Sequence, residues 1–233
     1  MRRTLTALAI LSLAASPSAG AQPVDTTFLE VGARGIDGTI FKPHAARVRV
    51  YVGDTQTAEW TNELTLGDSA GRKVMRWVTT GFPVPGNPNR PLSVLRQTYD
   101  AVTLAPLGFS NTVNNGAFTR VSIDRNRVRG SRRSAADTTV HTVDITLDRP
   151  GFFAGASDLV PVAAGLRTGS VLVAPVWSPN AAAADYRVFA ILGDTVVNVE
   201  GTPVRSRRVE ERKRSDRSLQ ATWCLMLESR YMV

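Results

Sequence analysis

The sequence has few of the residues from which proteins build disulfides and metal sites. Cys224 is the one cysteine among 233 residues, so no disulfide can form within the chain. The two histidines, His44 and His141, are far apart, and neither has a cysteine or a spaced carboxylate pair nearby. We therefore expect no metal and no cofactor. Trp223 and Leu225 flank Cys224 and favour its burial over a free thiol that could link two chains.

Lysine and long apolar runs are also scarce. Only three of the 28 basic residues are lysine, which indicates that codon bias contributes to the arginine count. No segment after residue 21 is long and apolar enough to cross a bilayer, so we expect no transmembrane segment. Much of the net charge of +8 falls in residues 1–21 and 204–233, and the body between them is nearly neutral. The charge therefore gives no reason to expect a nucleic-acid partner.

The first 21 residues have the pattern of a secretory signal peptide. Arg2 and Arg3 precede an uncharged run rich in leucine and alanine, residues 4–15. Small residues end the segment at Ala21, as a signal peptidase requires, and we expect cleavage between Ala21 and Gln22. The protein is thus expected to be exported, to the periplasm or the extracellular space.

Beyond the leader, residues 22–45 predict an extended N-terminal segment, and residues 46–233 predict a single β-rich domain. Apolar and polar residues alternate from Val48 to Val52 and again from Val140 to Leu147, which is the period of half-buried strands. Asn115-Gly116 predicts a tight turn between two further strands. Because the chain stops at Val233 in what resembles the start of a strand, we expect this domain to be truncated at its C-terminus.

Residues 152–166 differ from the rest, because β-branched residues thin out and alanine and glycine appear. Ser157 and Asp158 can begin a helical turn, and Pro161 is tolerated in such a turn. The pattern as a whole predicts a mainly β fold of the β-rich α+β class. It would be an antiparallel curved sheet or half-open barrel of about ten strands with one or two short helices.

The stretch Gly67-Asp68-Ser69-Ala70-Gly71 matches the nucleophile pattern of serine hydrolases. In that interpretation Ser69 attacks, His141 is its base, and an aspartate (100, 124 or 137) orients the histidine. The pattern requires a helix directly after the serine, whereas a β-branched and aromatic run follows here. A hairpin turn of small residues is the favoured interpretation, and hydrolysis by Ser69 and His141 stays an alternative.

Arginine is concentrated in two segments. Residues 120–133 hold six arginines and residues 204–217 hold seven basic groups. Such clusters can contact phosphates of a membrane surface or another polyanion, but they also occur on solvated strand edges, where charge prevents aggregation. A structural or polyanion-contacting protein of the cell envelope is therefore a second alternative.

Aromatic residues are spread over many of the expected strands and could line an apolar cavity or fill a plain core. The candidates for contact with a lipid or other apolar ligand are Trp77, Tyr99, Phe109, Phe152, Phe153 and Trp177.

Two stretches carry a family resemblance. Residues 99–107, followed by an alternating segment, resemble a strand–turn–strand unit of uncharacterised exported bacterial proteins. Residues 147–150, 158–160 and 165–169 are similar to the helical segment and following strand of those proteins. Their better-understood relatives are the periplasmic lipoprotein carriers, half-open antiparallel barrels with helices over the concave face. The resemblance covers about residues 45–210 and implies no catalytic residue; the proline-rich segment 81–91 and the early end depart from it.

The leading hypothesis from the sequence is an exported, non-enzymatic protein of the cell envelope that binds a lipid or other apolar ligand. The sequence identifies neither the ligand nor the oligomeric state.

Overall fold

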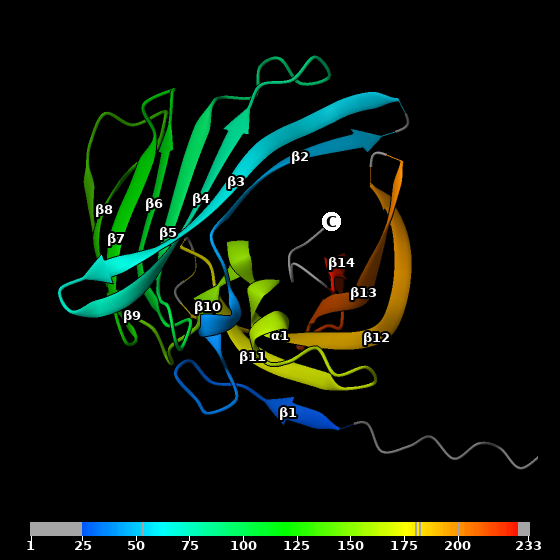
Figure 1. The fold of residues 1–233 in the computed structure, drawn as a ribbon. Coiled ribbons are helices and arrows are strands. Elements are labelled where there is room, and N and C mark those ends of the chain that lie inside the picture. The colour runs from blue at the N-terminus through cyan, green and yellow to red at the C-terminus, as the bar shows by residue number, and fades with distance from the viewer. Residues whose placement is uncertain (1–24, 53, 180, 182, 200, 228–233) are drawn as a thin grey trace, which may run out of the picture.

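A computed structural model of the chain describes residues 25–52, 54–179, 181, 183–199 and 201–227 (Figure 1). The predicted signal peptide and its predicted cleavage site lie outside the described residues. In these ranges the chain is β-rich and forms two sheets, which confirms the predicted class.

The first sheet has eight strands in the order of the chain, each antiparallel to the next. They are β2 (His44–Val52), β3 (Thr55–Ser69), β4 (Arg72–Phe82), β5 (Ser93–Asp100), β6 (Pro106–Val113), β7 (Phe118–Asp124), β8 (Arg127–Arg133) and β9 (His141–Thr146). Tight turns connect several of them. Ala70 and Gly71 both have positive φ between β3 and β4, and Gly116 has φ 88° in the Asn-Gly turn before β7, as the sequence predicts.

The second sheet joins both ends of the described chain. Its six strands are β1 (Thr26–Phe28), β10 (Phe152–Phe153), β11 (Val171–Trp177), β12 (Asp185–Val199), β13 (Thr202–Lys213) and β14 (Leu219–Met226). β11 to β14 are antiparallel, whereas β1 and β10 both pair with β11 in parallel. The N-terminal segment therefore contributes a strand to this sheet.

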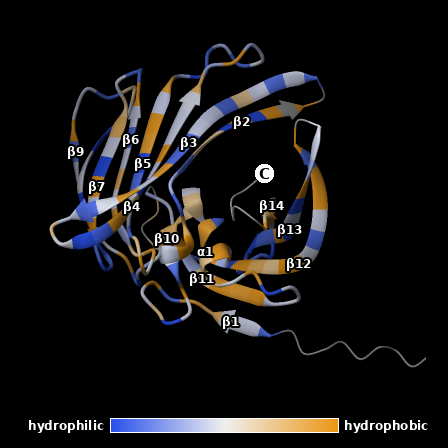
Figure 2. Cartoon of the chain, in the orientation of Figure 1, coloured by the Kyte–Doolittle hydropathy of each residue, from blue (hydrophilic) through white to orange (hydrophobic). Residues whose placement is uncertain are grey.

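Three short helical segments accompany the sheets: η1 (Gly38–Ile40), η2 (Ala154–Ala156) and α1 (Leu159–Ala163). The segment expected to be helical, residues 152–166, begins as strand β10 and contains only five α-helical residues. All five residues of α1 are buried, and the eight-stranded sheet curves around this helix (Figure 1). The apolar residues gather where the two sheets face α1, which places the core between them (Figure 2).

The expected number of strands is corrected. The described residues contain fourteen strands, more than the ten expected. Residues 202–213 form the long strand β13, although their arginines and glutamates obscure the alternation. β12 runs unbroken through fifteen residues, because a bulge between Ile191 and Gly193 lets it continue with Gly193 at φ 148°.

Within the described ranges neither sheet closes on itself. β2 and β9 each pair with a single neighbour at the two edges of the eight-stranded sheet. A search of the same residues for a helix long and apolar enough to span a membrane finds none.

Candidate functional site

The register of the eight-stranded sheet aligns side chains in rows that cross its concave face. One row consists of His44, Leu64, Trp77, Gln97, Phe109, Val121, Gly130 and Val143, each directly opposite the next. Leu64, Trp77 and Val121 belong to the core. A Cβ built on Gly155 would lie 3.0 Å from Nε2 of Gln97, so η2 packs directly on this row. The row and η2 form the floor of the concave face.

The next row is largely polar. Asn62, Thr79, Leu95 and Asn111 follow one another across β3 to β6. Thr79 Oγ1 accepts a hydrogen bond of 3.1 Å from Trp77 Nε1 and donates one of 2.8 Å to Asn62 Oδ1. Oδ1 of Asn111 is shielded from solvent and accepts no hydrogen bond from the described residues. This row therefore contains at least one buried acceptor that the described residues leave unpaired.

A third row, apolar again, lies beyond the polar one. Val48 is directly opposite Trp60, and Val50 is directly opposite Ala58. Val48, Val50 and Trp60 are half-buried, although they lie on the same face as the core residues Leu64 and Trp77. We call the following set the concave wall: Val48, Val50, Trp60, Asn62, Thr79, Leu95 and Asn111.

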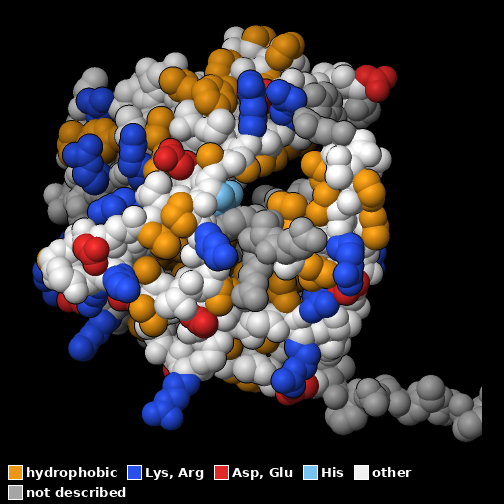
Figure 3. Space-filling model, in the orientation of Figure 1, with side chains coloured by type: hydrophobic (Ala, Val, Ile, Leu, Met, Phe, Trp, Pro, Cys, Tyr) orange, Lys and Arg blue, Asp and Glu red, His pale blue; other side chains and the backbone are white. Residues whose placement is uncertain are grey.

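The concave wall borders a depression of the described surface. Figure 3 shows the surface hollowed between the β2–β3 end of one sheet and the β12–β13 end of the other. On the second sheet the half-buried Trp223 stacks on Phe189, with ring centroids 6.0 Å apart. Each of the two sheets that border this hollow thus carries a half-buried aromatic ring on the face that also holds core residues.

The six aromatic residues predicted to contact a ligand gather below the concave wall. Phe153 is at their centre, with ring centroids 5.4 Å from Tyr99, 5.7 Å from Phe109 and 5.8 Å from Trp177. Five of the six are at most 6% exposed, and Phe109 packs against them half-buried. They fill the core, so a ligand would meet the residues of the concave wall instead. The sequence shows that Trp60 is aromatic, but it does not show on which side of the sheet Trp60 lies.

The structure does not bring Ser69 and His141 together. Ser69 ends β3, the second strand of the eight-stranded sheet, and His141 begins β9, the eighth. Six strand spacings of ~4.8 Å separate them across the sheet. The row that contains His141 also crosses β3 at Asn62, well before Ser69. His141 Nε2 instead lies 2.5 Å from Asp137, which accounts for the lowered pKa of that carboxyl.

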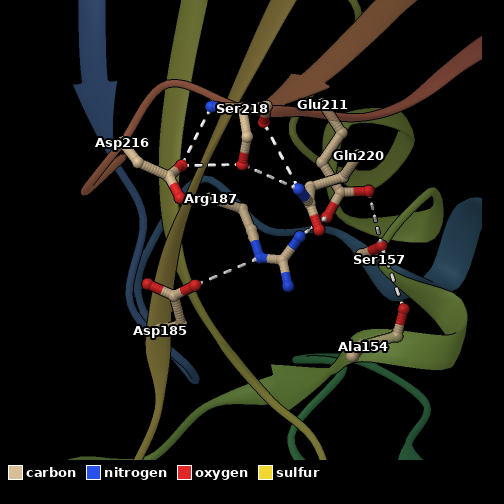
Figure 4. A network of polar contacts seen from close by, with 8 residues as sticks. All are labelled: Ala154, Ser157, Asp185, Arg187, Glu211, Asp216, Ser218 and Gln220. Atoms are coloured by element: carbon tan, nitrogen blue, oxygen red, sulfur yellow. Dashed lines mark hydrogen bonds and ion pairs between the residues drawn. The ribbon is translucent and has the colours of Figure 1, made fainter. Parts of the chain in front are cut away.

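A polar network lies beneath the start of α1 (Figure 4). Ser157 Oγ donates to Glu211 Oε2 over 3.1 Å, and the other carboxylate oxygen of Glu211 is 3.3 Å from Arg187 Nη1. Arg187 Nε is 3.7 Å from Asp185. Glu211 is buried, and burial raises its pKa although Arg187 and Ser157 oppose the shift. The network holds the segment before α1 against the second sheet.

Asp158 adjoins this network and carries the largest shift among these carboxylates. Burial, reinforced by the nearby charge of Glu211, raises the pKa of Asp158 to about 6. The half-buried Cys224 lies on β14 of the same sheet, opposite Arg208. Among the described residues no group of three or more histidine, cysteine or acidic side chains has a metal-binding arrangement.

The two arginine-rich segments are strands with many paired charges. In the first segment Arg127 forms an ion pair of 3.0 Å with Asp144. In the second, Arg207 pairs with Asp194 at 2.6 Å and Arg212 with Glu210 at 2.9 Å.

A separate apolar hollow of about 380 Å³ lies at the β3–β4 hairpin. Leu66 and Val102 line it and are 44% and 46% exposed. It provides a second place where an apolar group could bind.

Comparison of the chain with protein-family models, with curated proteins and with solved structures finds no match. The geometry of the concave wall is therefore the basis for a proposed function.

Proposed function

We propose that this protein is an exported, non-enzymatic binding protein of the cell envelope whose ligand is a lipid or another molecule with a long apolar part. The ligand lies on the concave wall, between the two sheets. The arrangement would be a half-open barrel with short helices on its floor, as in the periplasmic lipoprotein carriers. Export depends on the predicted signal peptide, residues 1–21.

The half-buried third row of the concave wall carries this proposal. Val48 and Trp60 continue the inner face of the core but stay half-buried, because the described helical segments η2 and α1 pack on the floor and not on this row. Burying apolar surface of this kind stabilises a complex by about 25 cal/mol per Å². An apolar chain placed against Val48 and Trp60 would therefore replace the missing cover.

The polar row makes an amphipathic ligand a better match than a purely apolar one. Asn111 Oδ1 accepts no hydrogen bond from the described residues, and a buried acceptor without a donor costs about 1–3 kcal/mol. If the half-buried Asn111 side chain turns toward the ligand, a hydroxyl or amide group of the ligand could donate to this oxygen while the apolar part covers Trp60.

Extraction of the purified, exported protein with organic solvent, followed by mass spectrometry, tests the proposal. We expect a co-purifying lipid or other apolar molecule, and a native mass spectrum with a corresponding added mass. A protein whose native mass equals that of the bare chain, and which takes up no lipid on incubation, would contradict the proposal.

A further inference from the structure

The convex face of the eight-stranded sheet carries a small basic hollow that the concave wall does not explain. Its volume is about 320 Å³, and it is lined by residues of β4 to β7. Arg76, Arg96 and Arg120 all line it and are all exposed. These three arginines come from three different strands, and we call the site the arginine hollow.

The register places the three arginines on the same face of four neighbouring strands. Arg96 and Arg120 are both directly opposite Ser110, one from each side, so their Cα atoms are two strand spacings or roughly 10 Å apart. Arg76 is opposite Thr98, which makes it the diagonal neighbour of Arg96, at roughly 7–8 Å. Long arginine side chains at these spacings can contact a single anion.

The floor between the arginines consists of small side chains. Gly108 has none, and Ser110 and Thr98 carry short hydroxyl side chains. A Cβ built on Gly108 would have its nearest neighbour 3.5 Å away, at the backbone oxygen of Val121, which leaves the hollow empty above it. The hydroxyls of Ser110 and Thr98 are available as donors on the same face.

The three arginines of the arginine hollow differ from other arginines of this face because they form no ion pair with a described carboxylate. Arg127 and Arg129 both approach Asp144, at 3.0 and 3.9 Å, and Arg47 pairs with Glu59. No acidic residue lines the arginine hollow, and within the described chain no ion pair joins its three arginines to a carboxylate. The described residues therefore leave the three guanidinium charges around the hydroxyls of Ser110 and Thr98 without a negative partner.

The acidic side chain closest to the hollow by register is Glu63. It is exposed on β3, directly opposite Val78, which is itself opposite Arg96. It is thus a diagonal neighbour of Arg76, but it does not line the hollow.

We propose that the arginine hollow binds a phosphate-type oxyanion, either the headgroup of an anionic lipid at a membrane surface or a soluble phosphate. Guanidinium groups donate two parallel hydrogen bonds to such oxyanions and keep their charge at every physiological pH. With a lipid headgroup in the hollow, the convex face would lie against the membrane while the concave wall stays open on the opposite side of the sheet.

Binding to vesicles and to inorganic phosphate tests this proposal and separates its two sources. The vesicles are phosphatidylcholine with phosphatidylglycerol, compared with phosphatidylcholine alone, and binding is measured by co-sedimentation at low and high salt. Phosphate binding is measured by calorimetry on the same protein. The variant is R96Q/R120Q, and the matched control is R205Q/R208Q, which removes the same charge from exposed arginines of β13.

If the lipid headgroup is the ligand, the protein binds only the anionic vesicles, and high salt releases it. Each arginine near an anionic surface contributes about 1 kcal/mol, so R96Q/R120Q should weaken binding about 30-fold. R205Q/R208Q should leave binding nearly unchanged. Phosphate binding that shows the same dependence on the two variants, without vesicle binding, would identify a soluble phosphate as the source.

Three outcomes would overturn the proposal: no binding of either probe, unchanged binding by R96Q/R120Q, or an equal loss in the two double variants. The last result would mean that net charge, and not the arginine hollow, attracts the anion. Both double variants replace exposed side chains, so we expect them to fold, and their urea unfolding curves should match the wild type. Extraction of the co-purified lipid tests the concave wall separately.

Discussion

Arg187 on β12 and Glu211 on β13 form an ion pair on the inner face of the second sheet, with Nη1 and Oε1 3.3 Å apart. Their side chains are 15% and 6% exposed, so both charges are largely withdrawn from water. The second carboxylate oxygen of Glu211 accepts the hydrogen bond of Ser157, which comes directly before Asp158 and α1. One carboxylate thus connects the sheet to the segment that closes the floor of the concave face.

Replacing one member of this pair should cost much more stability than replacing both. In R187M the buried charge of Glu211 loses its partner, and we expect a loss of about 3 kcal/mol in the free energy of unfolding, measured in urea. In R187M/E211M neither charge of the pair remains, so the double variant should recover part of this loss. A double variant less stable than R187M would contradict this interpretation of the pair.

Asp158 should make the protein less stable at neutral pH than in mild acid. The pKa of Asp158 in the folded protein is about 6, above the value of 3.8 usual for an aspartate, because burial disfavours its charge. Its contribution to stability is therefore complete below about pH 4 and is lost as the pH rises through 6. D158N removes this loss and should raise the free energy of unfolding at pH 7 by about 2 kcal/mol.

The control for D158N is D216N, measured over the same pH range. Hydrogen bonds from Ser218 lower the pKa of the exposed Asp216, so its charge stabilises the folded protein and D216N should not gain stability at pH 7. An equal gain in both variants would show that net charge, and not the burial of Asp158, sets the pH dependence.

Phe153 should be among the most costly core residues to truncate. Its ring lies within 6 Å of three other aromatic rings and is 1% exposed. F153A should reduce the free energy of unfolding by about 3–5 kcal/mol. The control V196A removes a side chain that is 63% exposed and should change stability by less than about 0.5 kcal/mol. A loss below about 1 kcal/mol for F153A would mean that the described core is not the one that holds the protein together.

Gly130 is required by a close approach of two strands. A Cβ at this position would lie 2.0 Å from the backbone oxygen of Arg120 on β7, and backbone atoms cannot move aside without disturbing the sheet. G130A should therefore destabilise the protein strongly, by several kcal/mol on the order of other overpacked sites. G108A, where the nearest atom is 3.5 Å away, is the matched control and should be tolerated. Thermal unfolding of the two variants provides the comparison.

The strands that alternate cleanly could be predicted from the sequence. The runs that form β2 and β9 indicate strands because every second residue is apolar or β-branched, and Asn-Gly indicates a turn because it accepts positive φ. β13 was missed because its buried positions include Ser206 and Glu211 beside Val209, so polar residues occupy the inner face. A partner distant in sequence makes such a position tolerable, and no local pattern reveals that partner.

The candidate site was less accessible to prediction than the fold. The aromatics were identified, but whether they line a hollow or fill the core depends on how η2 and α1 pack on the sheet. The contact between Ser157 and Glu211, 54 residues apart, is one of the interactions that decide this packing. Trp60 and Asn111 lie on the same face only because of the register of three successive strand pairs, from β3 to β6. A local sequence pattern does not give that register.

Titration of the protein with a fluorescent long-chain fatty acid tests the concave wall most directly. We expect saturable binding by the wild type and about tenfold weaker binding by W60A, the loss of roughly 1.4 kcal/mol of apolar contact. V48D, which places a charge opposite Trp60, should weaken binding at least as much. V102A, at the apolar hollow of the β3–β4 hairpin, is the control and should bind as the wild type does, with urea unfolding confirming that each variant is folded. Absence of saturable binding, or a loss in V102A but not in W60A and V48D, would contradict the account.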